Sequence, residues 1–237
     1  LVESAQNLAV FHKRRGLKAK VVELTDIYDE FNFGIADPKA IKRFLSFALR
    51  NWSGKKLSYA VLAGKGTFDY KNNLGYNENL VPTNMVSTPQ GLFASDCSYG
   101  DVFGQDGIPE IAIGRIPVLT PEELPDYIYK VSEYSSSNGD WTGRMILVAD
   151  FPDDRNDFTG DSESLTSFVN GYDVKRVYLP EFNSIEEAKE EFINQFNSGA
   201  LVVNYLGHAG LNRLSKSGLF WSEDIGLLNN NKMFPIM

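Results

Sequence analysis

Residues 199–210, GALVVNYLGHAG, decide how this chain is expected to fold. The apolar stretch 200–206 is followed at once by the pair Gly207-His208. A short, mainly apolar run bounded by glycine is typical of a strand, here in a largely parallel sheet that is covered on both faces. In open sheets of this kind, ligands bind beyond the carboxyl ends of the strands, so His208 lies where chemistry usually occurs.

Five further apolar runs have the composition and length of strands: 57–63, 111–116, 145–149, 174–179 and 233–237. Amphipathic stretches between several of them predict helices. Two of these helices have clear capping signals, Asp37 before Pro38 and Ser184 three residues before Glu187. Strands that alternate with helices predict an α/β fold whose sheet is mainly parallel and flanked by helices.

Length and composition suit a folded protein with a sizeable core. The chain has 237 residues, of which 43% are hydrophobic, which is enough for one large domain or two small ones. The polar stretch 135–140 has the composition of a linker, so we expect two α/β subdomains, residues 1–135 and 140–237. No apolar run approaches the length that spans a bilayer.

The balance of charge restricts the class of partner. Acidic residues outnumber basic ones 31 to 23, and the formal net charge is -8. Nucleic-acid binding needs clustered lysine and arginine, so we expect no nucleic-acid partner and consider cationic ligands or divalent metals more compatible. The single cysteine, Cys97, rules out a disulfide within this chain.

His208 is flanked by small residues, Gly207, Ala209 and Gly210. They would let a substrate backbone approach closely, and the N–H that follows the histidine could donate to a developing oxyanion. A histidine base also needs a thiol or hydroxyl within hydrogen-bond reach. The residues alone leave open the alternative that a neighbouring carbonyl satisfies His208 and that it has no catalytic role.

Cys97 is the first candidate for a nucleophile, but its surroundings argue against this role. It lies 111 positions before His208, in the expected first subdomain. Its neighbours Asp96 and Asp101 are anionic and disfavour the thiolate. We therefore expect Cys97 to be a partly buried small side chain without catalytic function.

A first acidic cluster lies in residues 94–115, ASDCSYGDVFGQDGIPEIAIGR. Asp96, Asp101, Asp106 and Glu110 occur there among glycines, an arrangement that can gather oxygen ligands for Ca²⁺. The spacing differs from that of an EF-hand loop. A solvated acidic turn is the open alternative, because aspartate and glycine are also common turn residues.

A second acidic cluster follows the expected strand 145–149. Its members are Asp150, Asp153, Asp154, Asp157 and Asp161. Because this cluster also lies beyond the carboxyl end of a strand, one member is a candidate to orient the histidine or to receive a cationic substrate side chain. A solvated loop is the alternative here as well.

Five segments together resemble peptidase family C25, whose best-known members are the gingipains: 26–45, 59–70, 79–86, 95–123 and 204–210. The pairing of IGRIP after an acidic, glycine-rich loop with a distal strand and Gly-His pair is the most specific part of this resemblance. It implies a caspase-like α/β fold of two subdomains, with a Cys/His dyad in the second. The implied activity is that of a cysteine endopeptidase acting on proteins or peptides.

The resemblance also implies roles for single residues. In the family the cysteine ends the strand after the histidine, which here is 233–237, so the nucleophile is expected a few residues past Met237 and this chain alone is expected to be inactive. His208 is then the general base or the imidazolium partner of the thiolate, and the backbone of Gly207 and Ala209 contributes to the oxyanion hole. Asp150 is expected to support the histidine, and Asp161 to select a basic P1 side chain.

Calcium binding and a secreted or cell-surface location are further implications of the resemblance. The loop with Asp101, Asp106 and Glu110 resembles an acidic element found in family members, and Asp96 is a further candidate ligand. Two other functions stay open: a sortase-like transpeptidase of the same family, and a catalytically inactive, calcium-stabilised surface module. The residues carry no indication of the oligomeric state.

Overall fold

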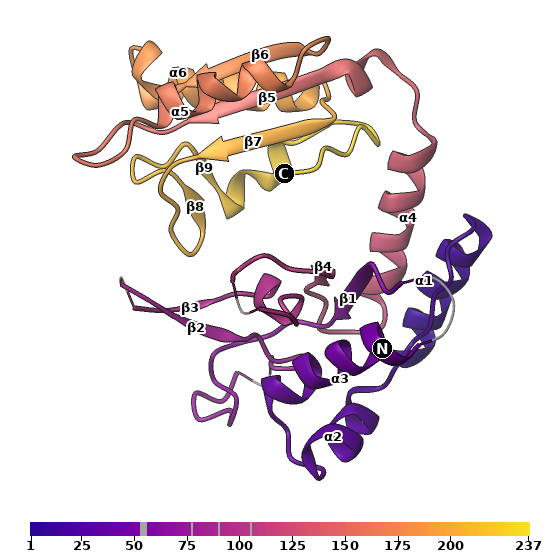
Figure 1. Cartoon of the computed structure of the whole chain (residues 1–237). Coiled ribbons are helices and arrows are strands. Elements are labelled where there is room, and N and C mark those ends of the chain that lie inside the picture. Colours follow the sequence, from indigo (N-terminus) through magenta and orange to yellow (C-terminus); the bar gives the residue numbers. More distant parts are fainter. Residues whose placement is uncertain (53–55, 77, 90, 105) are drawn as a thin grey trace. The chain divides into compact units, whose positions relative to one another are not determined.

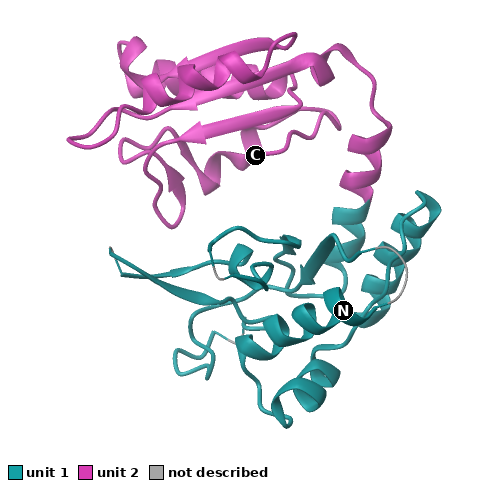
Figure 2. Cartoon of the chain, viewed as in Figure 1, with its two compact units in different colours: residues 1–128 teal, residues 129–237 magenta. Residues whose placement is uncertain are grey.

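The computed structural model describes residues 1–52, 56–76, 78–89, 91–104 and 106–237, and its elements are shown in Figure 1. Contacts divide the chain into two compact units, residues 1–128 and 129–237 (Figure 2). This division falls within helix α4 (Glu123–Ser136) and not at the polar stretch 135–140. No helix in the described ranges is long and apolar enough to cross a membrane.

Unit 1 combines helices with a small parallel sheet. Its helices are α1 (Val2–Arg14), α2 (Leu24–Asn32) and α3 (Pro38–Asn51), and strands β1 (Tyr59–Ala63) and β4 (Ala112–Ile116) pair in parallel. The cap of α3 is as predicted, since the Asp37 side chain accepts from the N–H of Lys39 at 2.7 Å. An antiparallel hairpin, β2 (Met85–Thr88) and β3 (Gly91–Ala94), is an element that the apolar runs do not predict.

Unit 2 contains a parallel sheet of three strands in the order β6-β5-β7. These strands are β5 (Arg144–Ala149), β6 (Asp173–Tyr178) and β7 (Val202–Leu206), and helices α5 (Phe158–Ser164) and α6 (Ile185–Asn197) lie between them in sequence. Ser184 caps α6 by accepting from the N–H of Glu187 at 3.2 Å. A short antiparallel hairpin, β8 (Arg213–Leu214) and β9 (Phe220–Trp221), follows β7.

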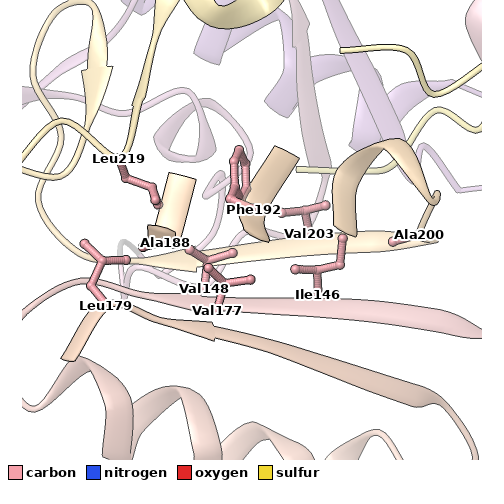
Figure 3. Close-up of a cluster of buried hydrophobic side chains, with 9 residues drawn as sticks. All are labelled: Ile146, Val148, Val177, Leu179, Ala188, Phe192, Ala200, Val203 and Leu219. Atoms are coloured by element: carbon pink, nitrogen blue, oxygen red, sulfur yellow. The ribbon is translucent and has the colours of Figure 1, made fainter. Parts of the chain in front are cut away.

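Strand β5 is buried on both faces, as its continuous apolar run indicates. Ile146 and Val148 point to one face, where Phe192 of α6 and Val203 of β7 complete a buried cluster (Figure 3). The residues between them, Leu147 and Ala149, pack on the other face with Tyr178 and with Phe158 of α5. Helices therefore cover both faces of the sheet, and the prediction of an α/β fold with parallel sheets flanked by helices is confirmed.

The final segment forms less strand than predicted. Ile236 makes one parallel bridge with Val202, in which the N–H of Val203 donates to the carbonyl of Ile236 at 2.8 Å. The first part of the predicted strand 233–237 is taken up by a turn, because the N–H of Met233 donates to the carbonyl of Asn230 at 2.8 Å. The predicted parallel direction beside β7 is confirmed, whereas the predicted length is wrong.

Candidate active site

His208 follows β7 at the carboxyl edge of the three-stranded sheet, and its side chain is 40% exposed. Its Nε2 lies 2.7 Å from Oδ2 of Asp153. An ionised carboxylate can only accept a hydrogen bond, so the neutral imidazole carries its proton on Nε2 and donates it to Asp153. Among the described residues no group bonds to the other ring nitrogen, Nδ1, which leaves a lone pair available for a proton.

Asp153 is itself held by the loop that contains it. Its Oδ1 accepts from the backbone N–H groups of Arg155 at 2.8 Å and Asn156 at 2.9 Å. The N–H of Arg155, the side-chain amide of Asn156 and the ring of His208 together hold the pKa of Asp153 well below its ordinary value. The carboxylate is therefore ionised at neutral pH and fixed in place before it meets the ring.

Phe158 contacts the imidazole from a second side. The two ring centroids are 5.5 Å apart and the ring planes are nearly perpendicular, at 86°. This edge-to-face contact belongs to helix α5, which packs on the sheet through the same residue. The ring of His208 thus lies between a carboxylate and an aromatic side chain, a geometry that restricts its rotation.

Asp150 lies below the main chain of His208 and does not contact the ring. It is 3% exposed, and its Oδ2 accepts from the backbone N–H of His208 at 3.1 Å. Asp150 therefore contacts only the main chain of His208, and Asp153 is the member of the second acidic cluster that contacts the ring. The reason is the close approach of the two strand ends: a Cβ on Gly207 would lie 2.3 Å from Cβ of Asp150, so glycine is required and Asp150 points into the core.

The loop after His208 leaves one backbone donor open. The N–H of Ser215 donates to the carbonyl of His208 at 2.8 Å, and the N–H of Gly210 donates to the carbonyl of Arg213, also at 2.8 Å. These bonds fix the loop, while the N–H of Ala209 has no acceptor within the part of the chain that the structure describes. Ala209 therefore keeps a donor beside the histidine, as an oxyanion site needs.

Two further members of the second acidic cluster, Asp157 and Asp161, lie at the start of α5 and differ in what their carboxylates contact. Asp157 caps α5, because its Oδ1 accepts from the N–H of Gly160 at 3.0 Å. Asp161 lies in the first turn of α5 and is exposed. No described residue bonds to its carboxylate, which therefore remains available to a ligand.

In the first acidic cluster, Asp96 is bound to Arg115. The guanidinium donates through Nε at 2.6 Å and through Nη2 at 2.8 Å, a two-pronged pairing that occupies both carboxylate oxygens. The same guanidinium donates to the carbonyls of Gly64 and Val81, both at 2.7 Å, so Arg115 joins three segments of unit 1. Arg115 is a partner of Asp96 that the acidic composition of this segment does not indicate.

The other three carboxylates of this loop bond mainly to its own backbone. Glu110 accepts from the N–H groups of residues 102 and 103 at 3.0 Å each, and Asp106 accepts from the N–H of Ile108 at 2.9 Å. Asp101 is buried, and its Oδ1 has no partner among the described residues. Within the described residues, no group of three or more His, Cys, Asp or Glu side chains is placed to hold a metal ion.

Cys97 begins a short 3-10 turn (Cys97–Tyr99) in unit 1. The expectation of partial burial is wrong, because the thiol is exposed and Tyr99, two residues later, fills the core instead. Cys97 belongs to unit 1 and His208 to unit 2.

Two residues of the site were missed by sequence reasoning. The hydroxyl of Tyr205 donates to the carbonyl of His208 at 2.6 Å, and Ser215 donates through its hydroxyl to Oδ1 of Asp150 at 2.7 Å. Burial and the nearby Asp150 raise the pKa of Tyr205 above its ordinary value, so the phenol keeps its proton. Tyr205 precedes His208 by three residues, but the sequence does not show that its side chain turns toward the loop after β7. That direction is known only from the positions of the strand and the loop.

Comparisons with known proteins agree on one family. The model of the family described as Peptidase family C25 matches residues 1–237. Among curated proteins the chain is similar to Gingipain R2 of Porphyromonas gingivalis, with 24% identity over 237 residues that cover 94% of this chain and 28% of the relative. It is also similar to Gingipain R1 of Porphyromonas gingivalis, with 24% identity over 94% of this chain and 21% of the relative. The chain thus spans less than a third of these relatives' length. No solved structure matches the chain at a significant level.

Proposed function

The chain belongs to peptidase family C25, and on this premise we propose that it supplies the histidine base of a cysteine endopeptidase. The observation that carries the proposal is the state of the His208 ring. Its Nε2 proton is held by Asp153 at 2.7 Å, and Nδ1 has no partner among the described residues. A ring fixed in this tautomer at a sheet edge is what a nucleophilic thiol requires of its base.

We propose that the nucleophile is a cysteine located after Met237. This proposal is supported by the parallel bridge between Val202 and Ile236. Because His208 lies six positions after Val202, a strand that continued in this register would reach the level of His208 six positions after Ile236. Parallel strands present their carboxyl ends at one edge, so a cysteine there would lie beside the imidazole.

The proposed reaction proceeds through an acyl-enzyme. The thiol proton passes to Nδ1 of His208, and the sulfur attacks the carbonyl carbon of the scissile bond, whose oxygen becomes an anion next to the N–H of Ala209. The C–N bond breaks when His208 returns the proton to the leaving amine. Water then attacks the carbonyl carbon of the thioester and gives a proton to Nδ1 of His208. The C–S bond breaks, the imidazolium returns the proton to the sulfur, and the thiol and the free acid are restored. Asp153 stabilises the imidazolium that forms in both steps.

We further propose that the site prefers a basic side chain at P1. Asp161 is exposed and its carboxylate has no partner among the described residues, so it can pair with a cationic side chain. The acidic balance of the chain, with a net charge of -8, favours such substrates on approach. We also propose that the protein acts outside the cell or at its surface, which the similarity to gingipains supports.

A transpeptidase of the same family remains the second candidate, because the acyl-enzyme can react with an amine in place of water. An inactive surface module is the third, and it would lack the cysteine. We also propose a calcium ion in the loop 101–110; its one support is Oδ1 of Asp101, which is buried and has no partner among the described residues. Within that loop Asp106 and Glu110 accept from its own backbone, and Asp96, which precedes the loop, pairs with Arg115.

The full-length protein tests the proposed function. We expect it to hydrolyse a fluorogenic peptide with arginine at P1 faster than one with glutamate, and iodoacetamide to abolish the activity by alkylating a cysteine after Met237, identified by mass spectrometry. An added amine that diverts most of the acyl product from the acid to the amide would identify the transpeptidase instead. Activity that survives complete alkylation would refute a cysteine mechanism.

A further inference from the structure

Both polar groups of the His208 backbone are bonded to side chains or backbone of the surrounding loop. The N–H donates to Oδ2 of Asp150 at 3.1 Å. The carbonyl accepts from the hydroxyl of Tyr205 at 2.6 Å and from the N–H of Ser215 at 2.8 Å. Three residues from two strand ends and one loop therefore hold the same peptide segment.

The directions of these bonds follow from counting protons. Tyr205 has one hydroxyl proton and two acceptors nearby, the His208 carbonyl at 2.6 Å and Oδ2 of Asp150 at 3.3 Å. The shorter contact receives the proton, and the N–H of Ser215 is shared between the phenol oxygen and the carbonyl of His208, at 2.8 Å from each. The hydroxyl of Ser215 donates to Oδ1 of Asp150 at 2.7 Å. The bonds thus form a closed ring through Asp150, His208, Tyr205 and Ser215.

Two features of this ring are costly for a purely structural element. Asp150 is 3% exposed and pairs with no lysine, arginine or histidine side chain among the described residues, so uncharged donors alone satisfy it. Ser215 is fully buried and has a φ of 63°, a left-handed conformation that residues with a side chain rarely adopt. A buried residue that surrounding contacts hold in this conformation is a candidate for a functional position.

We propose that Asp150, Tyr205 and Ser215 are positioning residues that fix the peptide of His208 and thereby the direction of its ring. Rotation of this peptide would swing the Cα–Cβ bond and move the imidazole away from Asp153. Small displacements of a catalytic group reduce rates strongly, because the reacting atoms must be held in near-attack geometry. The inference rests on the proposed role of His208 as the base.

The test uses Tyr205→Phe and Ser215→Ala in the full-length protein, each of which removes one oxygen atom. Tyr178→Phe and Ser162→Ala are matched controls: Tyr178 of β6 donates to Glu163 of α5, and Ser162 is a buried serine of α5. We expect kcat to fall at least tenfold in both test variants with KM within twofold, and both constants to stay within twofold in the controls.

A second readout does not depend on turnover. Nitrogen-15 NMR of the 237-residue chain should show the His208 proton on Nε2 in the parent and a mixture of Nδ1 and Nε2 tautomers in both test variants, with faster exchange of the His208 amide. Unchanged kcat together with an unchanged tautomer in both variants would overturn the inference. The variant His208→Ala separates this inference from the proposed function. If it keeps its activity, His208 is not the base and the proposed function fails. If it loses its activity, His208 is needed, and the Tyr205 and Ser215 variants then test the positioning role alone.

Discussion

Replacing Phe192 by alanine tests whether the buried cluster on the α6 face holds the strand that carries His208. Phe192 is 1% exposed, packs in the cluster with Val203 of β7, and has an edge-to-face partner in Phe220 at 5.3 Å. Loss of a buried phenylalanine costs about 3–5 kcal/mol. A unit of this size has a net stability of roughly 5–15 kcal/mol, so the loss is a large fraction of the whole.

The matched control is Phe168→Ala, since Phe168 belongs to the same unit but is 83% exposed. A surface change of this kind is expected within about 0.5 kcal/mol. With a shift of about 4 °C or more per kcal/mol for a domain of this size, Phe192→Ala should lower the melting temperature by about 15 °C and the control by about 2 °C.

Circular dichroism gives the two melting temperatures, and hydrogen exchange of the β5 and β7 amides confirms that unit 2 is the part affected. We expect faster exchange in β7 of Phe192→Ala and parent-like exchange in Phe168→Ala. Equal melting temperatures for the two variants would refute the reasoning that this cluster supports the strand before His208.

Three further outcomes are expected. Cys97→Ser should leave peptide hydrolysis by the full-length protein within twofold of the parent, and a large loss would identify Cys97 as the nucleophile. Calcium, compared with EDTA, should raise the melting temperature because it binds the folded state. The gain in the free energy of unfolding is about 2.7 kcal/mol when calcium is in hundredfold excess over Kd. Indistinguishable melting temperatures would show that the loop 101–110 is an acidic turn that binds no calcium. Arg176 and the Tyr178 hydroxyl lower the pKa of Glu163 to about 2 from 4.5. A depressed carboxyl pKa stabilises the fold above about 4.5 and the effect is lost as pH falls toward 2, so Glu163→Gln should weaken the fold by up to about 1 kcal/mol in urea unfolding at pH 7 and by less at pH 3; an equal loss at both pH values would contradict this.

Most of the fold could be predicted because unit 2 follows simple local rules. β5 is apolar after Arg144, β7 is apolar except for Asn204, and the Ser184 cap marks the start of α6. The hairpin β2–β3 was missed because its strands are short and largely exposed and show no buried apolar face. The strand expected at 233–237 was shortened by a turn at Asn231 and Lys232, both with positive φ, which the apolar composition of the segment conceals.

The site could be predicted only in part, because side-chain direction at a strand end depends on the neighbouring strand. The position of His208 follows from its place after an apolar run. The choice between Asp150 and Asp153 does not, because both occur in the same acidic loop. Asp150 points into the core because Gly207, which has no side chain, leaves room for it. Asp153 reaches the ring because the N–H of Arg155 in the following turn holds its carboxylate. Tyr205 and Ser215 are placed by tertiary contacts alone.

The central claim is that His208 acts as the base of a cysteine peptidase, and peptide hydrolysis by the full-length His208→Ala variant tests it most directly. The ring is 40% exposed, so its removal should change the melting temperature by only a few degrees. We expect turnover to fall by about 10²–10⁴-fold, the contribution typical of a general base. A correctly folded variant that keeps more than a tenth of the parent activity would contradict the claim.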